Sequence, residues 1–252
     1  MFKFRTFLLI AILLFSLSFI KDRAGNISSQ LNSFSENEKS LLAEIEKGVG
    51  EKMTYDVRLG SIRLGRSTFS HMPSVALNGK MLIVMVFETN LARFKDIETI
   101  YSDPQTLLPV KVEREVLNWF TREKITEDYN QRDFTVTINK KKGSKTETLL
   151  IKKDSPIQNA ILLPQSIRRS AKLDANETLV ANLPGSRYEI KLASVEEIKV
   201  PAGTFKAYHF KSTPSQIEIW ISADERKIPI KIQSNSVAFG YIMVLKEYNS
   251  GH

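Results

Sequence analysis

The chain has 252 residues, of which 42% are hydrophobic and 25% charged, proportions typical of a globular protein with a substantial core. It contains no cysteine, which excludes disulfide bonds, thiolate metal ligands, cysteine nucleophiles and a lipid-anchored lipoprotein. The net charge is +8, and +3 of it lies in residues 1–23.

Residues 1–23 predict export, as a signal peptide or an N-terminal anchor. Lys3 and Arg5 precede an apolar run from Phe7 to Ile20, which has the length of a signal-peptide core and is short for a membrane span. Ser16-Leu17-Ser18 offers a cleavage site, and an uncleaved anchor is the alternative. We therefore expect an exported, periplasmic protein, retained at the inner membrane if the segment is not cleaved. Export also argues against a nucleic-acid partner.

Residues 24–50 are expected to form a polar tether followed by a short amphipathic helix. The segment from Ser35 to Glu38 has the form of a capping box, and apolar residues at helical spacing continue to Gly48. From residue 51 the pattern changes to strands, and no repeat or linker interrupts it. We therefore expect a single β-rich domain over residues 51–249.

Runs of strand length, separated by turn residues, fill this domain. The predicted strands are 53–59, 62–69, 81–87, 97–101, 107–116, 119–129, 134–138, 146–151, 187–194, 205–211, 217–221, 227–232 and 237–248. Four residues are interpreted as shaping turns: Gly60, Gly65, Gly203 and Pro229. The prediction is a mainly β fold with one or two short helices. Its strands form either a large curved antiparallel sheet or two packed sheets, in a half-barrel or sandwich arrangement.

One helix is predicted inside the domain, between about Ser155 and Ser170. Asp154 or Ser155 can cap it, and Ile157 and Ile161 share a face. Pro164 is expected to kink this helix or to stop it near residue 162.

No motif for catalysis, metal binding or cofactor binding stands out. The three histidines lack the spacing of a zinc site, and His209 reads as a half-buried sheet residue. No nucleophile elbow or phosphate-binding glycine loop occurs. Two carboxylate pairs read as exposed strand residues: Glu113 with Glu115, and Glu123 with Glu127. No catalytic residue, metal or cofactor is therefore predicted, and a hydrolase is a minor alternative.

Apolar and basic residues supply the candidate contacts. Trp119, Phe120, Tyr208 and Trp220 are candidates for contact with a ligand or a protein interface, the alternative being an ordinary β core. The run from Lys140 to Lys142 lies at a predicted hairpin tip. It reads as a solvated loop or, alternatively, as a contact for anionic lipid headgroups or phosphate.

The order of several short motifs resembles the bacterial exported family called domain of unknown function 3108, over residues 53–248. The motifs are Tyr55-Asp56-Val57, Gly60 to Gly65, Tyr101-Ser102-Asp103-Pro104, Leu107-Leu108-Pro109, Glu127-Asp128-Tyr129, Val200 to Phe205, Ile219 to Ser222 and Lys227-Ile228-Pro229. The resemblance implies a periplasmic, mainly β protein without an assigned activity, so no catalytic residue can be carried over. A looser similarity is to periplasmic lipoprotein carriers of the LolA and LolB type, in which a curved sheet with helices inside binds acyl chains.

Together these features favour a non-enzymatic periplasmic protein that binds an apolar ligand, a lipid or an acyl chain in envelope maintenance. A module that docks another envelope protein is the alternative, and a hydrolase is the third. A carrier requires an apolar cavity of several hundred Å³, an interaction module a flat apolar patch, and a hydrolase a polar cleft with converging groups.

Overall fold

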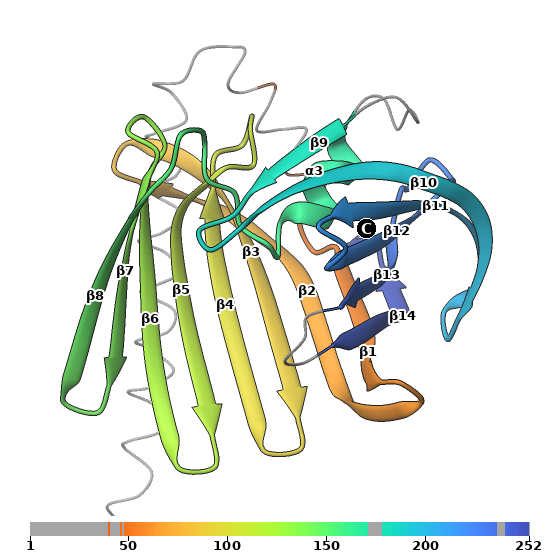
Figure 1. The fold of residues 1–252 in the computed structure, drawn as a ribbon, viewed down its shortest axis with the longest axis horizontal. Coiled ribbons are helices and arrows are strands. Elements are labelled where there is room, and N and C mark those ends of the chain that lie inside the picture. The colour runs from red at the N-terminus through yellow and green to blue at the C-terminus, as the bar shows by residue number, and fades with distance from the viewer. Residues whose placement is uncertain (1–39, 41–45, 47, 171–177, 236–239, 252) are drawn as a thin grey trace, which may run out of the picture.

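The computed structural model describes residues 40, 46, 48–170, 178–235 and 240–251 (Figure 1). Strands account for 68% of these residues, and all of them belong to one antiparallel sheet. The predicted mainly β fold is confirmed, and of its two forms the single curved sheet is the one present.

Fourteen strands and one helix make up the described part of the chain. The strands are β1 (Lys52–Leu59), β2 (Ile62–Leu77), β3 (Lys80–Leu91), β4 (Phe94–Ser102), β5 (Pro109–Asn118), β6 (Thr121–Asn130), β7 (Thr135–Lys142), β8 (Lys145–Lys152), β9 (Thr178–Asn182), β10 (Arg187–Val200), β11 (Gly203–Thr213), β12 (Ile217–Ser222), β13 (Pro229–Ser234) and β14 (Tyr241–Asn249). The helix is α3 (Leu163–Arg169).

The sheet order is β8-β7-β6-β5-β4-β3-β2-β1-β14-β13-β12-β11-β10-β9. Each strand therefore pairs with its neighbours in the chain, except that β8 does not pair with β9 and that β1 also pairs with β14. This pairing joins the two ends of the domain and leaves β8 and β9 as the edges, so the sheet curves without closing.

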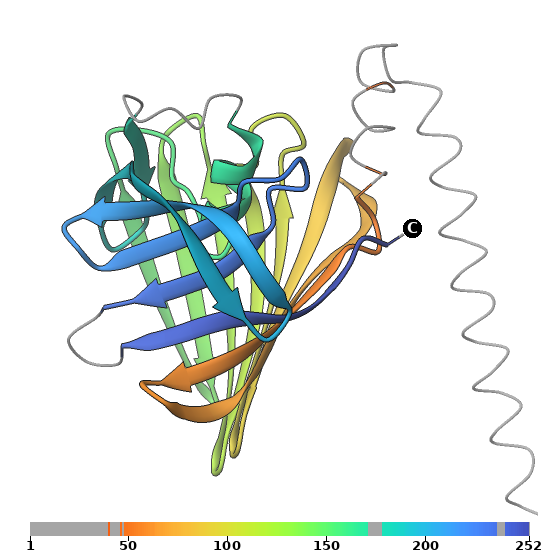
Figure 2. The same ribbon diagram turned by 90° about the vertical axis from the view of Figure 1, so that its right-hand side faces the viewer.

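The sheet has the form of a half-barrel that folds over α3. Strands β1 to β8 form one broad wall, and β9 to β14 curve over its upper part with α3 on the inner side (Figure 1). The long β10–β11 hairpin crosses the outer side of β12 to β14 (Figure 2), where Ala202 N–H donates to the Leu245 carbonyl at 3.1 Å. Irregular register on several strands, including shifts after Thr54, Val57 and Trp220, accompanies this curvature.

Buried hydrophobic residues on the sheet and on the segments packed against it form two clusters. The larger contains Met53, Tyr55, Ile83, Ile100 and Ile157, and the smaller contains Leu163, Ile167, Ile190, Ile219 and Ile221. The smaller cluster thus joins α3 to the concave face of β10 and β12.

The predicted helix from Ser155 is wrong over its first half. Residues 155–162 are irregular, and their backbone bonds to neighbouring elements: Gln158 N–H donates to the Asn182 carbonyl at 2.8 Å, and Ile157 N–H to Gln131 Oε1 at 2.9 Å. Pro164 lies in the first turn of α3, where its missing N–H is tolerated. The proline therefore begins the helix instead of ending it.

Two further local predictions differ from the structure. The predicted strand 119–129 begins only at Thr121, because Trp119 and Phe120 form the turn between β5 and β6. Gly65 lies inside β2 and not in a turn, and a Cβ built on it would come within 2.1 Å of the Asn90 carbonyl oxygen of β3. Glycine is required there because β2 and β3 approach each other closely.

The other three predicted turn residues lie at turns. Gly60 has a φ of +59° between β1 and β2, and Gly203 has a φ of +138° at the β10–β11 turn. Pro229 is the first residue of β13, directly after the β12–β13 connection.

Residues 1–39 lie outside the described residues, and with them the predicted signal peptide or anchor, the tether and the start of the amphipathic helix. Within the described segments, no helix has the length and the apolarity needed to cross a membrane.

Candidate functional site

A two-lobed cavity lies on the concave side of the sheet. Its larger lobe has a volume of about 780 Å³ and its smaller lobe about 260 Å³. Both lobes are lined by Phe87, Ala160, Ile161, Tyr241 and Met243, so they adjoin at the irregular segment that precedes α3. The larger lobe has the size of a small-molecule or acyl-chain site.

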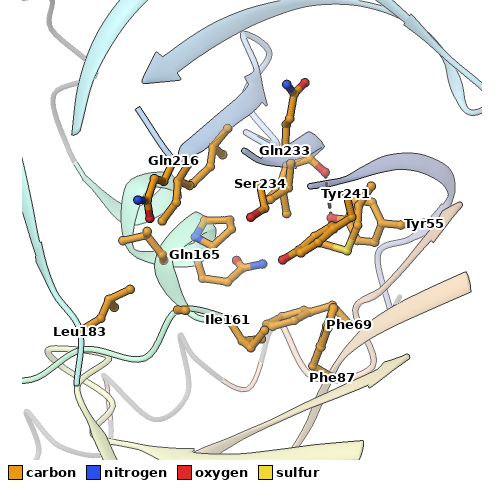
Figure 3. Close-up of a pocket in the computed structure, with 18 of the residues that line it drawn as sticks. Tyr55, Phe69, Phe87, Ile161, Gln165, Leu183, Gln216, Gln233, Ser234 and Tyr241 are labelled. Carbon is orange, nitrogen blue, oxygen red and sulfur yellow. Dashed lines mark hydrogen bonds between the residues drawn. The ribbon is translucent and has the colours of Figure 1, made fainter. Parts of the chain in front are cut away.

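The smaller lobe lies between α3 and β12 to β14 (Figure 3). Its apolar lining includes Phe69, Ile219 and Ile232, and amide side chains such as Gln165 and Gln216 stand among them. Two tyrosine hydroxyls at this lobe already have protein acceptors: Tyr55 donates to the Pro229 carbonyl at 2.8 Å, and Tyr188 to Gln216 Oε1 at 2.7 Å. Their rings are therefore left as apolar wall.

The larger lobe is mostly apolar and extends toward one end of the half-barrel. Inward-facing residues of β1 to β4 supply this wall: Val57, Leu59, Leu64, Phe87, Leu91 and Phe94. Side chains alternate between the two faces of a strand, so every second residue of these strands reaches the cavity. The lobe therefore depends on the register that pairs β1 to β4.

A charged group lies beside this apolar lining, on β4 to β6 of the same sheet. The Arg114 guanidinium forms a two-pronged ion pair with Asp96, at 2.9 and 2.5 Å, and lies 3.9 Å from Glu98. Asn159 donates to Glu98 Oε1 at 2.9 Å, and Glu127 accepts from the Tyr129 hydroxyl. Asp96 and Glu98 thus share one guanidinium, Glu127 adds a third carboxylate, and the wall presents more acceptors than donors.

Burial raises the pKa of Glu98, although the Asn159 amide and the Arg114 guanidinium both act to lower it. The Asp96 carboxylate raises the pKa of Arg114, so that the guanidinium stays charged. The buried position of Glu98 therefore disfavours the charged form of its carboxyl group.

Glu98→Gln is expected to raise the melting temperature at pH 7.5 and to leave it nearly unchanged at pH 4. The folded protein holds the Glu98 proton more tightly than the unfolded chain, so Glu98 contributes most to stability below the unfolded pKa, about 4.3. That contribution is lost as the pH rises through the raised folded pKa. Thermal unfolding of both proteins across this pH range measures the effect.

Glu88→Gln is the control, because Asn90 and Lys95 lower the pKa of Glu88. Its contribution is present above the unfolded pKa and is lost as the pH falls, so the substitution should act in the opposite direction at pH 7.5. A lower melting temperature for Glu98→Gln at pH 7.5 would show that its ion pair outweighs its burial.

The model of one protein family, "Protein of unknown function (DUF3108)", matches residues 54–246. The chain belongs to the DUF3108 family. The resemblance found in the sequence motifs is thereby confirmed, and the description of the family names no activity. A search of curated proteins finds no match to this DUF3108 chain.

The solved structures that this chain resembles, to different degrees, include three bacterial proteins. A β-barrel-like protein of domain of unknown function DUF1849 from Brucella abortus is 10% identical with a TM-score of 0.50, covering 80% of this chain and 97% of its own. A candidate exported protein with a YmcC-like fold from Bacteroides fragilis is 9% identical with a TM-score of 0.27, covering 80% and 96%. A candidate lipoprotein from Parabacteroides distasonis is 8% identical with a TM-score of 0.26, covering 81% and 96%. The first of these supports the fold alone.

In this DUF3108 protein, the four aromatic candidates do not come together. Trp119 and Phe120 lie at the β5–β6 hairpin tip and are exposed, with the Arg93 guanidinium 3.3 Å from the Trp119 ring centre. Tyr208 packs at the margin of the smaller core cluster and lines neither lobe. Their role as contacts stays a prediction.

Trp220 lies on the convex face, opposite Ile219 and Ile221. It is buried, stacks on the His209 ring with centroids 4.0 Å apart, and carries the Lys231 ammonium 3.9 Å above its ring. Its indole N–H donates to Glu196 at 2.6 Å. All its polar and π contacts are thus made within the protein.

His209 is buried more fully than the sequence predicts. Its Nε2 lies 2.7 Å from Glu218 and its Nδ1 lies 3.4 Å from Ser194. These residues lie on neighbouring strands of the same convex face, and none of them lines either lobe of the cavity. The arrangement holds β10, β11 and β12 together.

The charged group of the larger lobe was missed in the sequence, although a signal exists. Arg114 continues the apolar alternation of Val110 and Val112, so it falls on the inward face of its strand. Likewise, Glu127 shares its face with Tyr129. Charged residues at inward positions of neighbouring strands would have indicated a polar group inside the sheet.

Proposed function

We propose that this protein is a non-enzymatic binding protein that holds an amphipathic ligand, of the acyl-chain type, on the concave side of its sheet. The observation that supports this most is the larger lobe, about 780 Å³ with a mostly apolar lining. A cavity of this volume accommodates a chain of many methylene groups.

The exposure of the lining supports a ligand more than an ordinary core. Leu59, Leu64 and Tyr241 are large hydrophobic residues that line the larger lobe and remain exposed to solvent. A ligand that covered them would gain about 25 cal/mol for each Å² of apolar surface removed from water. A filled core leaves no such surface.

The charged wall indicates where the polar end of such a ligand would lie. Asp96, Glu98 and Glu127 offer carboxylate oxygens, and Arg114 and Asn159 offer donors. Hydroxyl or amine groups of a ligand would be hydrogen-bonded there, while its chain follows the apolar wall of β1 to β4.

The N-terminal segment supports a place of action in the periplasm. The basic residues and apolar run of residues 1–23 support export to the periplasm, and envelope maintenance is the process in which an acyl-chain carrier would act there. Binding to a neutral apolar probe tests the proposal without knowledge of the natural ligand.

Ala160→Trp is expected to weaken binding of N-phenyl-1-naphthylamine, a neutral apolar fluorophore, at least tenfold. Ala160 lines both lobes and is exposed to them, so an indole there fills the junction without entering the packed core. Probe fluorescence in a titration of the full chain measures the affinity, and oleate as a competitor tests for acyl chains.

Ala202→Trp is the matched control, since Ala202 is also exposed but lies on the outer β10–β11 turn. It should bind the probe like the wild type. If the wild type does not bind the probe, or if both variants lose binding equally, the concave cavity is not a ligand site. If the wild type binds the probe and Ala160→Trp alone loses it, recovery of lipid from the protein purified out of its own envelope would identify the natural ligand class.

A further inference from the structure

Four hairpins turn at the same end of the half-barrel. The tips of β1–β2, β3–β4, β5–β6 and β7–β8 all lie at the lower end in Figure 1, and Figure 2 shows the same placement from the side. We call residues 58–63, 91–95, 117–122 and 140–145 the tip surface. Leu59, Leu91 and Phe94 belong both to the tip surface and to the larger lobe, so the cavity reaches this end of the molecule.

The tip surface is strongly basic. Its segments contain nine lysines and arginines and no aspartate or glutamate: Arg58, Arg63, Arg93, Lys95, Arg122, Lys140, Lys141, Lys142 and Lys145. Among the described residues, four carboxylates pair with them, and all four lie further along the adjoining strands: Asp56, Glu88, Glu115 and Glu123. Nine cations against four carboxylates leave five unbalanced positive charges.

The three turns at the opposite end of the same strands carry no net charge. Its turns, at residues 77–80, 103–108 and 130–134, contain two basic and two acidic residues: Lys80, Arg132, Asp103 and Asp133. The hairpin turns at the end where the cavity reaches the surface are therefore more basic than the turns at the other end.

The most exposed apolar side chains of the tip surface lie at its hairpin turns. Trp119 is 59% exposed and Phe120 is 89% exposed, and Ile62 and Leu59 stand exposed on the β1–β2 hairpin. The Arg93 guanidinium lies on the Trp119 ring. Aromatic side chains that protrude among cations match the boundary between headgroups and acyl chains of an anionic bilayer.

We infer that the tip surface docks on an anionic lipid bilayer, with Trp119 and Phe120 inserted at the headgroup level and the basic residues on lipid phosphates. In this orientation the larger lobe faces the membrane. Basic residues near an anionic surface attract it, and the attraction weakens with salt. Docking is independent of whether the cavity holds a ligand, so the inference goes beyond the proposed function and can be tested alone.

The test uses the full chain with vesicles of phosphatidylglycerol and phosphatidylcholine, and with vesicles of phosphatidylcholine alone. Trp119 and Trp220 are the only tryptophans, and Trp220 is buried. Quenching by brominated lipids therefore reports contact of Trp119 itself, whatever the N-terminal segment does. We expect quenching and at least tenfold tighter binding with the anionic vesicles.

Two sets of variants locate the contact. Phe120→Ser and Lys141→Gln/Lys145→Gln should each reduce Trp119 quenching and weaken binding at least threefold, and the lysine pair should also reduce the dependence on salt. Lys80→Gln/Arg132→Gln removes the same number of charges at the opposite end and should leave both readouts unchanged. All these side chains are exposed, so the fold is not at risk.

Three results would overturn the inference. Vesicle binding without quenching of Trp119 would place the membrane contact elsewhere on the chain. Equal binding to both kinds of vesicle would exclude recognition of anionic lipid. Tight binding to dextran sulfate, with no Trp119 quenching by vesicles, would assign the charge to a soluble polyanion. The apolar-probe titration of Ala160→Trp is unaffected by any of these outcomes, so the two proposals fail separately.

Discussion

Gly65→Ala is expected to lower the free energy of unfolding by about 3 kcal/mol, at the upper end of the range for overpacking substitutions. The added Cβ would lie 2.1 Å from the Asn90 carbonyl oxygen and 2.9 Å from the Leu91 Cα, and both are backbone atoms of β3. Backbone cannot rotate aside as a side chain does, so β2 and β3 must separate. Urea denaturation of the full chain, followed by far-ultraviolet circular dichroism, measures the loss.

Gly185→Ala is the control for this substitution. No atom lies within 4 Å of a Cβ added to Gly185, and its φ does not lie in the left-handed region. The substitution should therefore be neutral, or stabilising by about 0.5 kcal/mol through the lower entropy of the unfolded chain. Equal effects at both glycines would mean that the separation of β2 and β3 is easily relaxed.

Arg168→Met is expected to lower the free energy of unfolding by about 3 kcal/mol. Arg168, in α3, forms two hydrogen bonds of 2.8 Å to the Glu51 carboxylate and a third, of 3.0 Å, to the Arg226 carbonyl. Glu51 is only 8% exposed, and in the variant its remaining partner is the Tyr248 hydroxyl at 2.9 Å. A buried charge without its counter-ion is strongly destabilising. Urea denaturation again supplies the measurement.

The double variant Glu51→Gln/Arg168→Met separates lost charge pairing from lost packing. It should recover at least half of the stability, because no buried charge is then left unpaired. Arg226→Met is the matched control: its ion pair with Asp224 is exposed and should contribute less than about 1 kcal/mol. A similar loss for both arginine variants would contradict a special role for the Glu51 contact.

Strands with strict alternation were predicted well. The isoleucines at 217, 219 and 221 gave β12, and the two-residue connection at Gly60 and Ser61 gave the β1–β2 hairpin. In such segments one face is buried by the sheet, so the pattern of side chains specifies both the strand and the face that it buries.

Segments whose partners lie far away in the sequence were predicted poorly. Ile157 and Ile161 have helical spacing, but Gln131 and Asn182 bind the backbone of that segment and hold it irregular. Trp119 is a large aromatic residue of a type often found in protein cores, but it lies at a hairpin tip and is therefore exposed. The local sequence pattern shows neither the distant hydrogen-bond partners of a segment nor the exposure of a side chain at a hairpin tip.

The sequence by itself determined the family, the β class and most of the strands, because alternation and turn chemistry act over a few residues. Only the tertiary structure decided how these strands assemble. The pairing of β1 with β14 joins segments almost 190 residues apart, and the curvature that follows brings Arg114, Glu127 and Asn159 to one cavity wall. The same antiparallel order places four basic hairpin tips at one end. The first arrangement depends on long-range pairing, whose energy no local window of sequence contains. The second requires β1 to β8 to pair in chain order, so that alternate turns fall at the same end.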